Sequence, residues 1–223
     1  MPTPRRKAPT SKRSQPAAPA EDAIVLSGPP GRLTTTVTVE NTSGARLVVR
    51  QPTLHLDGLS VTGSATAIIA TGATASVPVT VPLAASTPPG RHEAEMELGG
   101  VRRPVVVTVV EHLSLELSPS RVLAAPGRQD VTLVVTNSGN VRMPLASRAM
   151  ARTDDGGPDP GPDVALVLDA PIVVEPGQTL TLEARLEVPE ELEPARRHIA
   201  TIPVGTADLQ VIILPRDATE TTS

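Results

Sequence analysis

Four histidines are the residues of this chain best suited to acid–base chemistry or metal binding. They are His55, His92, His112 and His198, and none lies within metal-like spacing of another in the sequence. A metal ligand or a general base needs a positioned partner, and the sequence around each histidine signals none. We therefore expect a surface or turn histidine in each domain, with no catalytic residue among them.

An acidic, proline-rich segment in the second half is the other candidate site. Its carboxylates are Asp154, Asp155, Asp159 and Asp163. Calcium sites use such carboxylates on a loop, but the EF-hand spacing is absent. Prolines at 158, 160 and 162 remove backbone donors and stiffen the segment. We predict a solvated hairpin insertion over residues 152–163, with a calcium site or a contact with a partner as the alternatives.

Residue types that are missing exclude several further chemistries. The chain has no Cys, so it has no disulfide, thiolate ligand or cysteine nucleophile. It also has no Phe, Trp or Tyr, which disfavours base-stacking surfaces, aromatic sugar platforms and aromatic cages. No G-x-S-x-G, P-loop, H-E-x-x-H or dinucleotide motif occurs. We predict that the protein is not an enzyme and binds no cofactor.

The N-terminal segment carries a separate charge pattern. Its bases are Arg5, Arg6, Lys7, Lys12 and Arg13, and residues 1–20 contain no acid. The whole chain has a formal charge of −4. Without these five bases, residues 21–223 contain 15 bases and 24 acids, a formal charge of −9. The Pro, Ser, Ala and Arg content of the N-terminal segment predicts a disordered tail over residues 1–21. A short frayed end is predicted over residues 217–223. Five bases would bind nucleic acid or another polyanion only weakly and with strong salt dependence.

The same terminal segment bears on the cellular address. It has a charged beginning but no apolar stretch, so it does not read as a secretory signal. No segment approaches the roughly 20 apolar residues that span a bilayer. The default expectation is a soluble cytoplasmic protein, with a virion component or export without a leader as open alternatives.

The composition favours strands. Val (27) outnumbers Leu (22), and Thr adds 25 further β-branched residues. With 25 Pro and 16 Gly, turns are frequent and long helices are excluded. Turn signals recur about every 8–12 residues, which is typical of sandwich folds.

An internal repeat divides the chain. Gly31 and Asn41 match Gly127 and Asn137 at an offset of 96, and Gly72 matches Gly177 at an offset of 105. The difference is accounted for by the acidic insertion. We therefore predict two β-sandwich domains, at residues 22–111 and 112–216, joined almost directly from strand to strand.

Alternation along the predicted strands identifies the core. In the strand near 33–41, Leu33, Val37 and Val39 share one face, and Leu180–Val188 alternates in the same way in the second domain. We expect Leu133, Val135, Leu182 and Leu186 to replace the buried ring of an immunoglobulin-type core. Pro78 and Pro82 predict that the strand near 75–82 is an edge at that point.

Turn motifs give the chain a family resemblance. Val39-Glu-Asn-Thr-Ser-Gly44 and Val135-Thr-Asn-Ser-Gly139 are similar to the turn that closes strand B in tandem bacterial immunoglobulin-like modules of the NPCBM-associated (NEW3) and CARDB type. Val174–Leu180 and Pro88–Ala94 also look like that family's entries into strands E and F. The usual strand-F aromatic is absent, and His92 and His198 stand near its place. The resemblance implies a spacer or binding role and supplies no catalytic residue.

Two functions of different classes follow from these observations. The first is a non-catalytic spacer, scaffold or protein-binding module that uses exposed strand edges or loop tips. The alternative is a tether, in which the basic tail docks on nucleic acid or another polyanion while the domains engage a protein partner. An enzyme is the third and most distant option.

Calorimetry tests the solvated-loop interpretation of the acidic segment. Titration with sub-millimolar Ca²⁺ should give no heat beyond dilution, because the prolines oppose the wrapping of a loop around a cation. Saturable binding that is abolished by Asp155→Asn and Asp159→Asn would contradict this interpretation.

Overall fold

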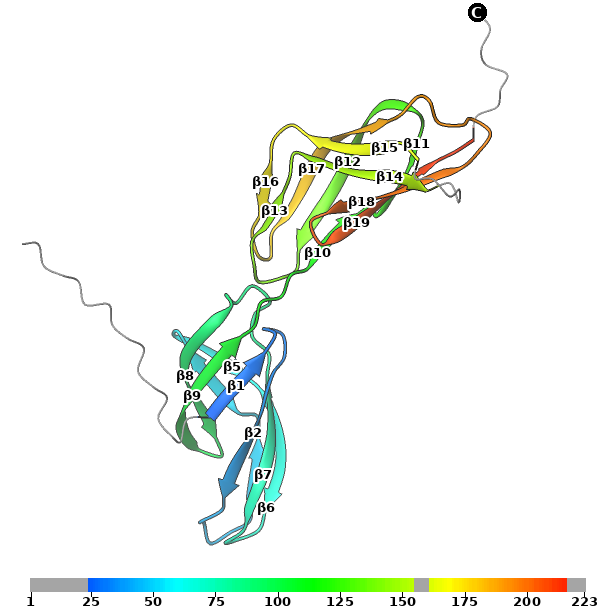
Figure 1. The fold of residues 1–223 in the computed structure, drawn as a ribbon. Helices are drawn as coiled ribbons and strands as arrows, with labels where there is room; N and C mark the ends of the chain where they lie inside the picture. The colour runs from blue at the N-terminus through cyan, green and yellow to red at the C-terminus, as the bar shows by residue number, and fades with distance from the viewer. Residues whose placement is uncertain (1–23, 155–160, 216–223) are drawn as a thin grey trace, which may run out of the picture.

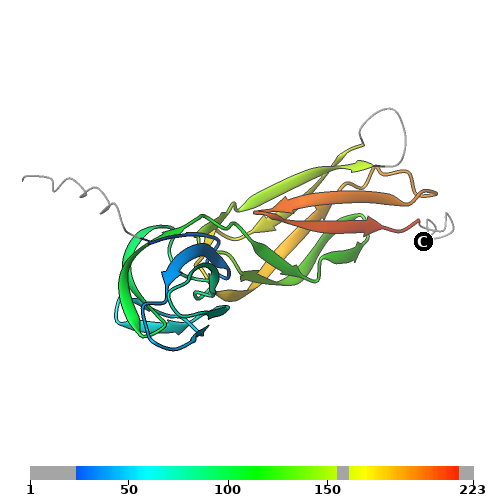
Figure 2. The same cartoon turned by 90° about the horizontal axis from the view of Figure 1, so that it is seen from below.

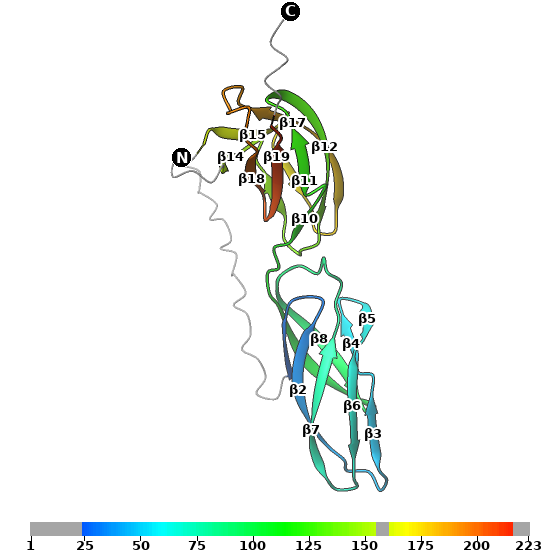
Figure 3. The same cartoon turned by 90° about the vertical axis from the view of Figure 1, so that its right-hand side faces the viewer.

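The computed structural model describes residues 24–154 and 161–215. The protein is all-β, with two immunoglobulin-like sandwiches in tandem and no helix among the described residues (Figure 1). Figure 1 shows β9 of the first sandwich leading into the segment that joins the two, and Figures 2 and 3 show the same arrangement from below and from the side, with the sandwiches end to end in Figure 3.

The first sandwich is built from nine strands. They are β1 (Ile24–Gly28), β2 (Leu33–Glu40), β3 (Leu47–Arg50), β4 (Thr53–Leu56), β5 (Leu59–Thr62), β6 (Ser64–Ile69), β7 (Thr74–Val81), β8 (Gly90–Leu98) and β9 (Val101–Val109). Their order is β3-β6-β7-β2-β1-β9-β8-β4-β5. β1 pairs antiparallel with β2 at one position and parallel with β9 at five, so it connects the two layers.

The second sandwich follows the same plan with ten strands. They are β10 (Leu115–Ser118), β11 (Arg121–Ala124), β12 (Gly127–Asn137), β13 (Met143–Leu145), β14 (Arg148–Asp154), β15 (Asp163–Leu168), β16 (Ile172–Val174), β17 (Thr179–Val188), β18 (His198–Val204) and β19 (Ala207–Ile213). Eight form one sheet in the order β10-β12-β17-β15-β14-β18-β19-β11, and β13 pairs separately with β16.

Strand pairing repeats between the two sandwiches with the offsets seen in the sequence. Val39 pairs with Ala75 in the first, and Val135 pairs with Leu180 in the second. Likewise, the ladder that joins Leu47 to Ile69 recurs as the ladder from Met143 to Val174. The offsets of 96 and 105 are therefore a repeat of backbone pairing as well as of residue types.

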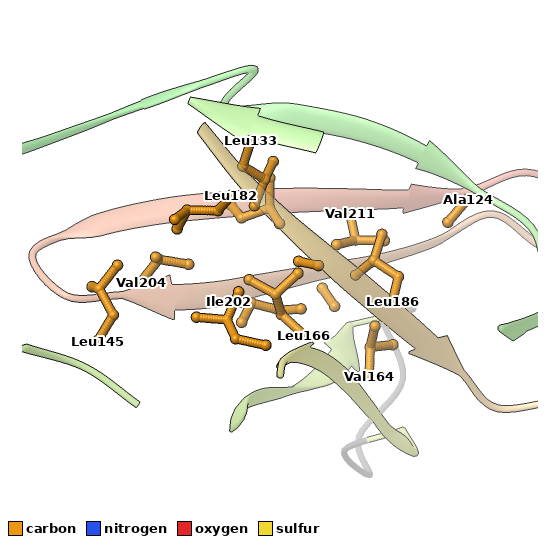
Figure 4. Close-up of a cluster of buried hydrophobic side chains, with 14 of the residues drawn as sticks. Ala124, Leu133, Leu145, Val164, Leu166, Leu182, Leu186, Ile202, Val204 and Val211 are labelled. Atoms are coloured by element: carbon orange, nitrogen blue, oxygen red, sulfur yellow. The ribbon is translucent and has the colours of Figure 1, made fainter. Parts of the chain in front are cut away.

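The core of the second sandwich is aliphatic, as predicted. Leu133, Val135 and Leu186 are fully buried and Leu182 is 5 % exposed. Figure 4 shows Leu133 and Leu182 facing the layer that carries Val211 and Ile202. The intervening residues Thr181, Glu183 and Arg185 are exposed, so the period of two holds along β17.

Breaks in the backbone divide several extended segments into two strands each. β3 and β4 are separated at Gln51, which has φ of +46°, and at Pro52. β3 pairs with β6 and β4 pairs with β8, so the chain changes its pairing partner at this break. β13 and β14 are likewise separate strands, as are β15 and β16.

Pro78 was predicted to mark an edge at its own position, and on one side of β7 it does, although β7 is an internal strand of the sheet. β7 lies between β2 and β6 in the sheet. However, β6 pairs only with Val79 and Thr80 before it leaves for β3. Its ladder with β7 therefore ends beside Pro78, which has no N–H to donate.

Paired alanine substitutions on β17 test the register and the core. Leu182→Ala should lower the free energy of unfolding by about 2–5 kcal/mol, because it leaves a cavity that no bulky neighbour can cover. Thr181→Ala, on the opposite face, should change it by no more than about 0.5 kcal/mol. Chemical denaturation measures both, and equal effects would mean that the register of β17 is wrong.

Candidate functional site

A buried asparagine organises the turn after β12. Asn137 is completely buried, and its Nδ2 donates to the carbonyls of Val141 (2.8 Å) and Val174 (2.9 Å). Its Oδ1 accepts from the backbone N–H of Gly139 at 3.0 Å. The side chain therefore ties the end of β12 to β16 and to the segment that leads into β13, and its donors and acceptor are all used.

The first sandwich contains the same arrangement. Asn41 donates to the carbonyls of Ala45 and Ile69 and accepts from the N–H of Ser43. Its backbone also pairs with Gly72, as that of Asn137 pairs with Gly177. Both glycines have positive φ, near +70°, which only glycine adopts without strain. The turn motif around Asn41 and Asn137 is thus a hydrogen-bond network in which the buried asparagine side chain has partners for both its amide nitrogen and its amide oxygen.

The turn of the second sandwich lies against the linker between the domains, residues 110–114. The N–H groups of Ser138 and Gly139 donate to the carbonyl of Ser114. A Cβ on Gly139 would collide with the carbonyl oxygen of His112 and would lie 2.9 Å from the N of Ser114. The absence of a side chain at Gly139 therefore permits this approach of two backbones.

Asn140 extends the turn to the first sandwich. Its Nδ2 donates to the carbonyl of Thr87 at 3.1 Å and to that of Val110 at 3.0 Å. Its Oδ1 accepts from the N–H of His112 at 2.7 Å, and its own N–H donates to the His112 carbonyl at 3.0 Å. The residue is only 3 % exposed. One residue of the second domain thus bonds to a loop of the first domain through its side chain and to the linker through both its side chain and its backbone.

The linker itself contributes little packing. Val110 and Leu113 are 42 % and 54 % exposed. Ser86 approaches Gly177, whose added Cβ would lie 3.9 Å from the Ser86 Cβ. The hydrogen bonds of Asn140, and those of the turn that holds it, are therefore the main interactions that fix the two sandwiches relative to each other. Nothing in the local sequence distinguished Asn140 from an ordinary turn residue.

The four histidines are placed as structural residues. His92 and His198 hold equivalent positions, and each Nε2 lies 3.0 Å from the carbonyl of a preceding loop residue, Pro88 or Glu193. His112 is exposed in the linker. The expectation of surface or turn histidines was wrong for His198, which is 3 % exposed because it points inward at the start of β18.

The structure brings His55 and Ser60 into a contact that the sequence motifs did not predict. His55 Nδ1 lies 2.9 Å from Ser60 Oγ, because the two residues pair directly across the β4–β5 hairpin. The His55 Nε2 is buried and has no hydrogen-bond partner among the described residues. No carboxylate therefore orients the ring, as a nucleophilic triad requires. A two-residue Asp-Gly turn is the signal that could have found this pair.

Two of the four acidic residues lie in the described ranges, at the same end of the paired strands β14 and β15. Asp154 is exposed at the end of β14, and Asp163 begins β15 with its Oδ1 3.7 Å from Arg152 Nε. Asp155 and Asp159 lie outside the described residues. Across 24–154 and 161–215, no three His, Asp or Glu side chains gather closely enough to hold a metal ion. The basic residues Arg5, Arg6, Lys7, Lys12 and Arg13 also lie outside the described ranges.

A charged hollow of about 440 Å³ opens on the outer face of the second sandwich. Glu187 lines it, 2.8 Å from Arg148 and 3.6 Å from Arg128. The two arginines share this one carboxylate, and Asp163, Glu190 and Glu191 also line the hollow. Four acids thus accompany two arginines, so the hollow has no excess positive charge for an anionic ligand.

Comparisons with known proteins give distant likenesses. No protein-family model matches the chain, and no curated protein sequence does. Similar solved structures include the CupB2 chaperone of Pseudomonas aeruginosa, at 11 % identity and a TM-score of 0.29 over 85 % of this chain and 96 % of that one. The chaperone–tip subunit complex CsuC–CsuE of Acinetobacter baumannii matches at 14 % and 0.26 over 87 % and 96 %.

A third similar structure is the secreted serine protease VesC of Vibrio cholerae, at 11 % identity and a TM-score of 0.25 over 73 % of this chain and 44 % of that one. Scores at this level carry no argument about function. The described part of the chain contains no helix, and therefore none that could span a bilayer.

Substitution of the buried asparagine tests its role in the second sandwich. Asn137→Ala leaves the buried Val174 carbonyl and the partly buried Val141 carbonyl without this donor, so it should lower the free energy of unfolding by about 3 kcal/mol. Thr136→Ala, at the adjacent outward position, should cost no more than about 0.5 kcal/mol. Urea denaturation measures both variants. A cost for Asn137→Ala as small as that for Thr136→Ala would show that the network does not stabilise the fold.

Proposed function

We propose that the protein is a non-catalytic scaffold that holds two immunoglobulin-like sandwiches in a fixed end-to-end orientation and presents them to protein partners. The single observation that carries this proposal is the interdomain bonding of Asn140. A linker that served only as a tether would need no buried side chain with all its polar atoms bonded across the joint.

The cost of losing these bonds supports a fixed joint. Hinge motion at the linker would separate Asn140 from Thr87 and Val110 and expose or orphan their polar groups. An unsatisfied buried donor or acceptor costs about 1–3 kcal/mol. The closed joint is therefore favoured over a swinging one, although the linker's own side chains are largely exposed.

Exposed strand edges support a protein-binding role. In the first sheet the terminal strands are β3 and β5, and in the second sheet they are β10 and β11. Apolar residues stand beside three of them: Val48 and Ile68 face each other across β3 and β6, Leu59 lies on β5, and Leu123 lies on β11. Open edges with apolar neighbours are suited to strand addition by a partner.

Two further observations argue against catalysis as the main activity. Among the described residues, no carboxylate bonds to the Nε2 of His55 in the Ser60–His55 pair, and the hollow around Glu187 has no excess positive charge for an anionic substrate. The tether alternative depends on residues outside the described ranges, so no contact in the structure favours it.

Distance measurements between spin labels test the fixed joint. The chain has no cysteine, so Thr36→Cys and Thr181→Cys, both at exposed positions, provide one label on each sandwich. We expect a single narrow distance distribution for the otherwise unchanged chain. Asn140→Ala removes the side-chain bonds to Thr87, Val110 and His112 and should broaden the distribution.

Asn140→Asp is a second variant, which separates the contribution of the two donated bonds from that of the accepted bond. It retains the acceptor for His112 but loses both donors to Thr87 and Val110, so it should broaden the distribution nearly as much as Asn140→Ala. Thermal melts of each variant should show that both sandwiches stay folded. A broad distribution in the parent chain would overturn the proposal of a rigid scaffold.

A further inference from the structure

The edge of the first sheet at β3 carries an apolar pair on an otherwise polar face. Val48 of β3 and Ile68 of β6 pair directly, and they are 45 % and 62 % exposed. The outward positions of the next two strands, β7 and β2, hold only polar residues and one proline: Thr34, Thr36, Thr38, Glu40, Thr74, Ser76, Pro78 and Thr80. The large apolar side chains on this face therefore lie at its edge.

Two arginines flank this apolar pair. Arg46 lies two residues before Val48 and Arg50 lies two residues after it, and they alternate with Leu47 and Val49, which pack into the core. Both arginines are exposed. Neither has an ion pair or a side-chain hydrogen bond with any residue that the structure describes. The edge therefore presents an apolar centre between two uncompensated positive charges.

The second sandwich closes the corresponding edge with a proline. At the offset of 96, Pro144 of β13 takes the place of Val48, and it pairs with Val173 as Val48 pairs with Ile68. Pro144 has no N–H and cannot exchange two hydrogen bonds with Val173, so its backbone faces away from β16. The same register in the first sandwich turns the N–H and carbonyl of Val48 toward the free side of β3. These groups can pair with a further strand.

The free side of β3 has room for such a strand. β3 is the terminal strand of its sheet, and Figure 3 shows it at the outer margin of the first sandwich beside β6. An added strand would place one residue beside Val48 and the residues two positions to either side of it beside Arg46 and Arg50, because alternate side chains share a face. Carboxylates at those two positions would give each arginine a partner, and an apolar central residue would cover Val48.

The chain itself does not supply a strand of this pattern from a second β3 or from its ends. Two copies of β3 paired antiparallel would set Arg46 of one against Arg50 of the other, and like charges directly opposite are destabilising. Residues 1–20 contain five bases and no acid. Segments 155–160 and 216–223 contain acids, but neither has an apolar residue with a carboxylate two positions away on both sides. The charges of the edge therefore favour a different protein.

We propose that the free edge of β3 docks an extended segment of a different protein, in which an apolar residue is flanked by carboxylates two positions away on each side. The site rests on the proposed protein-binding role and specifies which edge is used and what partner chemistry it takes. Backbone pairing at Val48 supplies the affinity of strand addition, and Arg46 and Arg50 select the acidic flanking residues.

A defined peptide pair tests the site on the full chain. The probe is Thr-Glu-Thr-Val-Thr-Glu-Thr with blocked ends, and the control peptide has glutamine at both glutamate positions. NMR should show saturable shifts of the Val48 N–H and of the methyl groups of Val48 and Ile68 with the glutamate peptide. The glutamine peptide should bind about two- to thirtyfold more weakly, because it keeps the backbone pairing and loses both charge pairs. Added salt should reduce this difference.

A proline variant tests the backbone pairing. Val48→Pro copies the closure at Pro144 and should abolish the shifts with both peptides. The ladder to β6 keeps its hydrogen bonds, because the N–H that the proline removes faces the free side. A thermal melt shows whether the variant is folded, and the comparison of the two peptides on the parent chain does not depend on it.

A pair of double variants tests the charges. Arg46→Gln with Arg50→Gln should make the two peptides bind equally. Arg32→Gln with Arg91→Gln removes the same net charge at exposed positions on other strands and turns, and should leave the preference for the glutamate peptide unchanged.

Three outcomes would overturn this inference. They are equal binding of the two peptides to the parent chain at low salt, no saturable shift at Val48 up to millimolar peptide, and shifts at Val48 that grow with protein concentration alone, which would assign the edge to a second copy. None of them changes the interdomain distance distribution, so failure of the docking site is distinguishable from failure of the rigid scaffold.

Discussion

A buried amide that bonds three backbone segments is the constraint on which the rest of the molecule depends. Asn137 bridges the end of β12, the segment before β13 and the end of β16, and Asn41 does the same in the first sandwich. Without it, carbonyls in the interior would have no donor, and the turn could take other conformations. The amide therefore stabilises each sandwich and fixes the shape of one of its ends.

The same turn has a different consequence in each domain. In the second sandwich it presents Gly139 and Asn140 to the linker, and the joint forms around them. In the first sandwich the corresponding turn carries exposed residues Thr42, Ser43 and Gly44. The asparagine turn stabilises both domains. Among the described residues it forms an interdomain contact only in the second domain, because only that turn lies against another backbone segment, the linker.

Absence of aromatic residues shapes both the core and the surface. Leucine, valine, isoleucine, alanine and methionine fill the space between the layers at full burial. Aliphatic side chains pack well when strands are regular, and a hollow of about 180 Å³ remains beside Leu145, Ala149 and Val204.

Several properties follow from the sequence by itself. The period of two along β2 and β17, the repeat at offsets of 96 and 105, and the aliphatic core around Leu133 and Leu186 are local or additive patterns. Such patterns are legible because a strand's faces are set by the order of its own residues. The asparagine turns were also visible as motifs, although their burial was not.

Only the tertiary structure decided the joint and the Ser60–His55 contact. Each depends on which segments lie side by side, and no single residue records that arrangement. Asn140 likewise has its role because the first domain's Thr87 lies within hydrogen-bond distance, a proximity 53 positions away in the chain.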